Sequence, residues 1–252
     1  MNRITKILAF TFLFCGSLQS VAQQLHIGAT TAYNATFVLD KGLSEDPRYN
    51  STYTYNFAPI GVSVGVDLGN SFGLSLESIL SKQGQIYEII DAAEQIKGER
   101  NIDLTYINMP LLLKFMSGGN GAARANFNIG PQLAFLTDAV ETMQYSAGTY
   151  KIPDDPNWQL PDGATENPDG TYTTPELSPT EIYSKASDDF KNMEFQIAAA
   201  FGVDFDLAKH LYLSTQIRAN YSLTDMKSGD AWDAITSGNA KDLVGERANL
   251  LV

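Results

Sequence analysis

Apolar and polar residues alternate along much of this chain, most regularly in residues 192–207. There the odd positions, beginning with Met193, are apolar, and the even positions, beginning with Asn192, are polar or small. An alternation with a period of two is typical of a β-strand with one apolar and one polar face. This run is sixteen residues long, whereas strands of globular proteins cluster at about five or six residues. A tilted strand that crosses a bilayer needs about 9 to 11 residues, so the length indicates a membrane strand with some overhang.

Seven further segments alternate in the same way, which predicts eight strands in total. The predicted strands cover residues 25–37, 53–68, 72–83, 102–115, 125–136, 192–207, 211–223 and, more weakly, 242–252. Short links lie near residues 69–71, 116–124 and 208–210, and long links lie near residues 39–52, 84–101, 137–189 and 224–241. Short turns that alternate with long loops around an even number of strands are the pattern of an outer-membrane barrel.

The sequence therefore predicts an all-β fold, an eight-stranded antiparallel up-and-down transmembrane β-barrel with short periplasmic turns, long extracellular loops and periplasmic termini. Side chains fill the lumen of so narrow a barrel, so we expect a plug and not a pore. The apolar face of each strand would meet lipid. Arginine at Phe201 or Ile197 is expected to block assembly, because a charge at the bilayer midplane costs about 2–4 kcal/mol in such barrels. Serine at Gly202 or Ala200, on the opposite face, is expected to be mild.

The N-terminus has the features of a secretory signal peptide. Arg3 and Lys6 precede an apolar run, and small residues stand before and at Ala22. We expect cleavage after Ala22, so that residues 1–22 are the signal peptide and residues 23–252 are the barrel domain. Cys15, the single cysteine, would leave with the signal, and the mature chain would fold without disulfides. A lipoprotein is the alternative, but the bulky Phe14 before Cys15 argues against it.

The chain is acidic, with 17 basic and 29 acidic residues, and residues 1–22 hold two of the basic residues and none of the acidic ones. This charge argues against nucleic acid or an anionic surface as a partner. No run of eighteen apolar residues follows residue 22. Any membrane span would therefore consist of strands, with outer-membrane lipid as the surrounding partner.

Two motifs resemble the PorT-like outer-membrane β-barrel family of Bacteroidetes. Residues 106–115, Tyr-Ile-Asn-Met-Pro-Leu-Leu-Leu-Lys-Phe, resemble that family's Tyr-Leu-Glu-Ile-Pro-Leu-Leu-Leu-Lys-Tyr strand, with Asn108 in place of its usual Glu. Residues 130–136 resemble the Gly-Pro strand that follows, and residues 81–84 resemble the end of the family's third strand. The resemblance spans roughly residues 23–252 and implies an outer-membrane location and a barrel fold. Most members have no assigned activity, and a few are tied to secretion or gliding, so a link to either process is an expectation from the resemblance.

Apparent catalytic and ligand-binding motifs have plainer interpretations. Residues 61–65 match the G-x-S-x-G nucleophile elbow, which requires a strand that turns sharply into a helix, but they lie inside an alternating strand. The two histidines, His26 and His210, fall on the periplasmic side in this topology, away from the outer rim where barrel enzymes keep their catalytic groups. The Gly-rich residues 118–121 fall where a turn is required and no helix follows them, which argues against a phosphate loop. We therefore expect no enzymatic activity, no cofactor and no metal site.

Five charged residues fall on the inward face of the predicted strands. They are Glu77, Lys114, Glu194, Asp204 and Arg218. Charges in a narrow and partly dry lumen must pair or remain hydrated, so we expect a structural ion-pair network. A proton or ion path is the alternative.

The third long link, the acidic loop 138–189, is the least explained part of the sequence. Between residues 138 and 190 there are eleven acidic and two basic residues, with Trp158 and several tyrosines among them. A structureless loop of this length is usually functional or disordered. Three interpretations remain open: a solvated surface that repels other molecules, a loop that binds a protein partner or ligand, and a calcium site.

The sequence thus predicts a non-enzymatic barrel with a structural or loop-mediated binding role at the cell surface. The alternative is a soluble exported carrier with a lipocalin-like barrel, whose strands would be apolar inside and polar outside. The last predicted strand is weak and lacks the terminal aromatic residue that barrels of the resembled family usually have. We expect the chain to be a fragment, short by roughly 8–12 residues if the last strand is to match its neighbours, and we expect its first strand to be partly unpaired.

Overall fold

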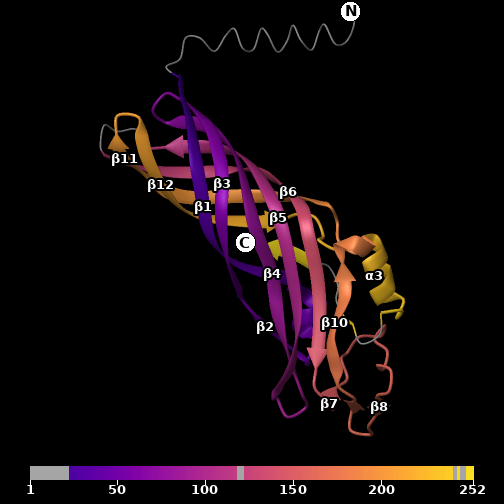
Figure 1. Ribbon diagram of the computed structural model, residues 1–252. Helices are drawn as coiled ribbons and strands as arrows, with labels where there is room; N and C mark the ends of the chain where they lie inside the picture. Colours follow the sequence, from indigo (N-terminus) through magenta and orange to yellow (C-terminus); the bar gives the residue numbers. More distant parts are fainter. Residues whose placement is uncertain (1–22, 118–121, 241–242, 245–247) are drawn as a thin grey trace, which may run out of the picture.

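The computed structural model describes residues 23–117, 122–240, 243–244 and 248–252, and eight antiparallel strands form a ring in it (Figure 1). These strands are β1 (Gln23–Asp40), β3 (Thr54–Leu68), β4 (Phe72–Ile90), β5 (Ile96–Met116), β6 (Ala123–Tyr145), β11 (Met193–Ala208), β12 (Leu211–Ser222) and β13 (Ala248–Leu251). Each strand pairs with its neighbours in this order, and β13 pairs again with β1. The predicted all-β, eight-stranded antiparallel fold is confirmed. The predicted signal peptide and the turn at residues 118–121 lie outside the described residues.

The alternation places apolar side chains on the outside of the ring and polar or small ones inside it. On β11, Phe201 is 64% exposed, whereas the neighbouring Ala200 is 3% exposed. On β12, Ile217 is 86% exposed. A water-soluble protein does not expose so continuous an apolar surface, whereas a barrel in lipid does. The lipocalin-like alternative requires the opposite arrangement, so the structure contradicts it.

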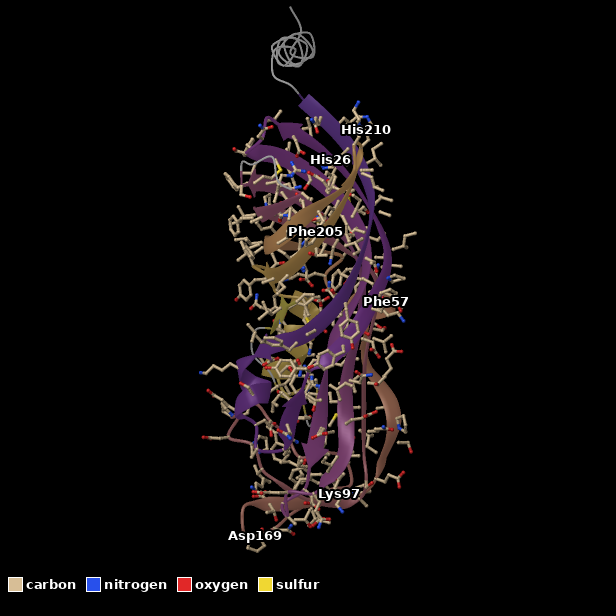
Figure 2. The ribbon with its side chains drawn as sticks, turned by 90° about the vertical axis from the view of Figure 1, so that its left-hand side faces the viewer. His26, Phe57, Lys97, Asp169, Phe205 and His210 are labelled. Carbon is tan, nitrogen blue, oxygen red and sulfur yellow. The ribbon has the colours of Figure 1, made fainter. Side chains whose placement is uncertain are left out.

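Aromatic side chains mark one edge of this outer apolar surface. Phe72, Phe115 and Phe127 stand side by side next to the short turns, with ring centroids 5.6 Å apart for Phe72 and Phe115 and 6.4 Å apart for Phe115 and Phe127. We call the end of the molecule with the short turns the turn end; His26 and His210 lie there, and Lys97 and Asp169 lie at the opposite end (Figure 2).

The polarity of the two faces inverts partway along β4, β5 and β6. On β5, the outward residues are apolar from Phe115 to Ile107 and polar from Thr105 to Glu99. The inward residues change the other way: Lys114 and Asn108 are buried near the turn end, and further along the same face Leu104 and Ile102 are buried. The apolar band on the outside therefore ends near Ile107 on β5 and, by the same change, near Phe135 on β6; on β4 the last well-exposed apolar residue is Leu80, and the inward face becomes apolar only from Tyr87.

Beyond the apolar band the chain forms a folded lobe, which we define as residues 41–52, 82–105, 137–191, 224–240 and 243–244. The extended ends of β4, β5 and β6 run into it (Figure 1) and pair with two shorter strands, β2 (Tyr49–Thr52) on β4 and β10 (Leu177–Ser184) on β6. A second sheet joins β7 (Gly148–Lys151), β9 (Thr171–Thr174) and β8 (Thr165–Glu166) in that order.

The lobe corrects two expectations. The strands predicted at residues 72–83, 102–115 and 125–136 are in fact 19, 21 and 23 residues long. The acidic segment 138–189 is also not structureless, since it contributes to both sheets of the lobe. The predicted strands end too early because the prediction requires apolar residues at the outward positions. Beyond the apolar band the strands continue with polar residues at those positions.

Short helical segments complete the lobe. They are α2 (Lys41–Glu45), the 3₁₀ turn η2 (Lys185–Ser187) and α3 (Gly229–Thr236). The α3 helix begins after Ser228, whose hydroxyl accepts a hydrogen bond from the amide of Ala231 and so satisfies one free donor of the first turn. In the part of the chain that the structure describes, no helix is long and apolar enough to cross a bilayer.

The ring closes through a short contact. β13 pairs with β1 only over Phe37–Asp40, and it pairs with β12 at Tyr221. Among the described residues, positions 23–36 of β1 therefore have a strand partner on the β3 side alone. This agrees with the expectation of a partly unpaired first strand. The described part of the weak strand predicted at 242–252 is confined to Ala248–Leu251.

Candidate functional site

A polar cavity of about 1640 Å³ lies in the half of the barrel near the turn end. It is bordered by β1 and β12, and its lining includes the inward side chains of Ser75, Glu77, Asn108 and Arg218. These residues face inward because each stands on the polar side of an alternating strand. The inward face thus gives the barrel a hydrophilic lumen, as in membrane barrels.

Four of the five predicted lumen charges form two separate ion pairs. Arg218 on β12 donates from Nη1 to Glu77 Oε2 at 2.7 Å and from Nη2 to Glu77 Oε1 at 2.8 Å, which is a bidentate contact across the lumen to β4. Lys114 Nζ on β5 lies 2.7 Å from Asp204 Oδ2 on β11. Asn126 supports the second pair by donating to Asp204 Oδ1 at 2.7 Å.

Glu194, the fifth predicted residue, lies apart from these pairs near the lobe end of the barrel. It accepts hydrogen bonds from the hydroxyl of Tyr106 and, at 3.2 Å, from the side-chain amide of Gln196. Gln132 donates to Gln196 at 2.5 Å, and all four side chains are almost fully buried. This layer of polar side chains fills the lumen between the cavity and the lobe.

A second ion cluster lies inside the lobe. Arg100 on β5 donates from Nε to Glu141 Oε1 on β6 at 2.6 Å, and Lys227 Nζ lies 3.1 Å from Glu141 Oε2. All three side chains are at most 1% exposed. We call Arg100, Glu141 and Lys227 the lobe ion cluster.

The lobe ion cluster shifts the pKa of each member. Burial alone would raise the pKa of the Glu141 carboxyl, but Arg100 and Lys227 together hold that pKa below its ordinary value. Burial lowers the pKa of the Lys227 ammonium, and Arg100 adds to this effect while Glu141 opposes it. Burial also raises the pKa of the neighbouring Tyr183 hydroxyl to about 12.

The sequence reasoning missed this cluster because its members fall in three different predicted links. Arg100 lies in the link 84–101, Glu141 in the acidic loop, and Lys227 in the link 224–241. The available signal was that Arg100 has the same strand parity as Tyr106 and Lys114 and so faces inward if β5 continues.

The centre of the lobe near β7 and β9 is aromatic. The rings of Trp158 and Tyr172 lie 5.2 Å apart, and those of Tyr150 and Tyr172 lie 5.9 Å apart. Arg48, which is buried, donates to the Tyr172 hydroxyl at 2.9 Å and pairs with Asp46 at 2.9 Å. Through these contacts the residues around Trp158 pack against the residues just before β2. The aromatic and cation–π contacts explain how the acidic segment 138–189 folds although it is polar.

The residues that could suggest metal or hydrolytic chemistry have other roles in the part of the chain that the structure describes. Among the described residues, no three or more His, Cys, Asp or Glu side chains come together as metal ligands. Acidic residues of the third link serve turns instead: Asp155 accepts from the amide of Asn157 at 2.8 Å, and Asp169 accepts from the Thr171 hydroxyl at 2.6 Å. Residues 61–65 lie within β3 and pair on both sides, without the strand-to-helix turn that a nucleophile elbow needs.

Comparison with known proteins gives one family. A family model described as an outer membrane protein beta-barrel domain matches residues 20–228. Searches of curated proteins and of solved structures found no significant match.

Proposed function

Because the chain belongs to the outer-membrane β-barrel domain family, which places it in the outer membrane, we propose that it acts without catalysis, as an anchor that holds a folded binding lobe at the cell surface. The barrel supplies the attachment to lipid. The lobe supplies the surface that a protein partner or ligand contacts.

The observation that carries this proposal is the inversion of polarity along β4, β5 and β6. Within the apolar band the outward side chains suit lipid, and beyond it they suit water, as Asp103 and Glu99 show on β5. Beyond the apolar band the inward side chains of the same strands become apolar. These side chains, among them Tyr87 and Met143, belong to the core of the lobe. A lobe with its own core is a rigid platform, which binds a partner at a lower entropic cost than a disordered loop does.

The direction of the barrel follows the usual rule for this architecture. Short turns face the periplasm and long connections face outward, so the lobe lies outside the cell and the start of β1 lies on the periplasmic side, whereas Val252 lies beside Asn220, nearer the lobe. Residues 1–22 act as the signal peptide that delivers the chain for this insertion, and residues 23–252 form the barrel domain.

The surface of the lobe favours a cationic partner over a nucleic acid. Exposed carboxylates include Asp154, Glu166, Asp169 and Glu181.

The motifs at residues 106–115 and 130–136 support a place in the PorT-like branch found in Bacteroidetes, and with it a partner that belongs to secretion or gliding.

Site-specific photo-crosslinking in cells tests the binding role. A photoreactive residue at Asp169, which is exposed on the lobe, should give discrete crosslinked products with surface proteins. The same residue at Lys209, which is exposed at the turn end, serves as the matched control and should give a different set. Identical sets from both positions, or no product from Asp169 in protein that fractionates with the outer membrane, would contradict the proposal.

A further inference from the structure

One segment of the lobe links β12 to β13 and packs against the rest of the lobe. We call residues 224–240 and 243–244 the cover segment; it contains α3, which lies where the barrel meets the lobe (Figure 1). Several of its side chains are buried in the core of the lobe. They are Met226, Ala231, Ile235, Leu243 and Val244.

The cover segment is tied to the chain beside it by backbone hydrogen bonds. The amide of Lys191 donates to the carbonyl of Met226 at 2.9 Å, and the amide of Ser228 donates to the carbonyl of Asp189 at 2.8 Å. These bonds join only the first residues of the segment to the residues just before β11. They fix where the segment starts and leave α3 to be held by side chains.

Charged side chains join the cover segment to the strand wall in addition to its buried apolar side chains. Lys227 of the cover segment reaches Glu141 on β6 at 3.1 Å, and Arg100 on β5 donates from Nη1 to the carbonyl of Val244 at 3.4 Å. The Lys227 ammonium also lies over two aromatic rings, 4.6 Å from the centroid of Tyr183 and 5.2 Å from that of Trp232. The lobe ion cluster therefore spans the boundary between wall and cover.

This boundary is incompletely satisfied. Glu141 Oε2 and Lys227 Nζ face each other at 3.1 Å, but Arg100 Nη2 is buried and lacks a hydrogen-bond partner among the described residues. A buried ion pair recovers its desolvation cost only when its remaining donors and acceptors are also bonded. The charged part of the boundary thus depends on a single carboxylate, Glu141, that serves two buried cations.

We propose that the cover segment covers the apolar inner face of the lobe and opens separately from the barrel, and that the lobe ion cluster is the latch that holds it shut. This inference rests on the proposed function only in requiring a folded barrel. Release of the latch exposes the inner face of the lobe.

Fluorescence quenching by acrylamide can follow the cover segment directly. The chain has two tryptophans, so the Trp158→Phe variant leaves Trp232 of α3 as the source of the tryptophan fluorescence. In the full chain, folded in detergent, Glu141→Gln should raise the quenching constant of Trp232 about two- to threefold, because it leaves two buried cations without their anion and favours local opening. The barrel itself should remain heat-modifiable on a gel.

Three further variants make the test specific. The double variant Glu141→Gln/Lys227→Met should lower the quenching constant again toward that of the parent, because it removes the second unpaired cation. Lys227→Met alone should give a smaller increase than Glu141→Gln. Glu94→Gln removes the exposed contact of Glu94 with Lys151 at 4.0 Å and should change nothing.

Two results would overturn the proposal. One is unchanged quenching of Trp232 in both Glu141→Gln and Lys227→Met. The other is exposure of Trp232 only together with loss of the heat-modifiable barrel, which would make the segment part of one cooperative core. Failure of the parent protein to fractionate with the outer membrane would contradict the proposed function instead, and the quenching comparison in detergent would still be readable.

Discussion

At the scale of single residues, the charges inside the molecule are arranged in small separate groups. Glu77 with Arg218 and Lys114 with Asp204 stand in the lumen, and the lobe ion cluster stands beyond the polar layer around Glu194. The two lumen pairs each join different strands and balance their charges, whereas the lobe ion cluster has two cations for one carboxylate. This arrangement predicts that the effect of a mutation depends on which partner remains.

Removal of Arg218 should leave Glu77 without its bidentate partner. Because the Arg218 side chain is 21% exposed, we expect Arg218→Ala to cost about 2–3 kcal/mol, somewhat below the usual cost of breaking a buried pair. Glu77→Gln added to it should recover much of that loss. Urea unfolding in detergent measures the cycle, and strictly additive effects would contradict the pairing. Arg124→Ala, which breaks a more exposed contact with Asp206 at 3.1 Å, should cost less than about 1 kcal/mol.

Acid should release the cover segment through Glu141. The pKa of this carboxyl is lowered from its ordinary value of 4.5, so its contribution to stability is fully present above pH 4.5 and is lost as the pH falls through the lowered value. Lys227 affects stability in a different pH range. Its pKa is lowered from 10.5 in the folded protein, so the free energy of unfolding rises as the pH increases from the lowered pKa to 10.5. The other titratable groups that face the cluster are Asp40, Tyr49, Tyr87, Tyr183 and Asp189.

The measurement is the quenching of Trp232 in the Trp158→Phe variant as the pH is lowered. Quenching should rise below pH 4.5 when Glu141 is present, whereas Glu141→Gln should be already open and should show no such transition. A transition of the same size in both proteins would assign the acid sensitivity to another carboxylate, such as Asp40 or Asp189.

The outward and inward positions of β11 should respond oppositely to substitution. Phe201→Arg places a charge in the apolar band and should block assembly, at a cost of about 2–4 kcal/mol, whereas Ala200→Ser should be mild. For Gly202 the mild effect expected from the sequence is wrong, because a Cβ there would collide with the backbone carbonyl oxygen of Thr215. Heat-modifiability on a gel separates these outcomes, and normal assembly of Phe201→Arg would contradict the lipid-facing assignment.

At the scale of elements, each of the strands β4, β5 and β6 passes through two environments, the lipid around the barrel and the water around the lobe. On β4 and β5 the same alternate positions face inward along the whole strand, but the polarity of each face changes where the surroundings change from lipid to water. On β6 a register irregularity next to Thr137 and Asp138 accompanies this change and shifts which positions face inward. The lobe is consequently continuous with the barrel and yet has a core of its own.

This division predicts that the lobe can be loosened while the barrel stays intact. Tyr172 is 2% exposed and contacts Tyr150, Trp158 and Arg48. Tyr172→Ala should cost about 3–5 kcal/mol locally and make residues 148–175 sensitive to limited proteolysis. Heat-modifiability should be retained, and its loss together with the lobe would show that the two parts fold as one. Thr173→Ala, at an exposed position of the same strand, is the matched control.

At the scale of the whole molecule, the two ends differ in character. The turn end has short connections and the polar cavity, and the lobe end has the folded acidic surface (Figure 2). A barrel inserted in one direction presents these ends to different compartments, so the asymmetry gives the proposed orientation a direct test.

Labelling of single cysteines measures the orientation. In a Cys15→Ser background, Asp169→Cys should react with a membrane-impermeant maleimide on intact cells, because the lobe is outside. Lys209→Cys should react only after the outer membrane is permeabilised. The reverse result would place the lobe in the periplasm and contradict the display of a binding surface.

The sequence by itself determined the strands, their order and the outward apolar face, because a period of two fixes which side chains share a face whatever surrounds it. It also identified Glu77, Lys114, Asp204 and Arg218 as inward charges, because parity alone is enough for that. Only the tertiary structure decided that residues 138–189 fold into a lobe and that Arg100, Glu141 and Lys227 meet. The physical reason is that local alternation does not state whether a face meets lipid, water or another strand. That depends on the height of each residue along the barrel axis and on segments more than 80 residues away in the chain, such as Lys227 from Glu141.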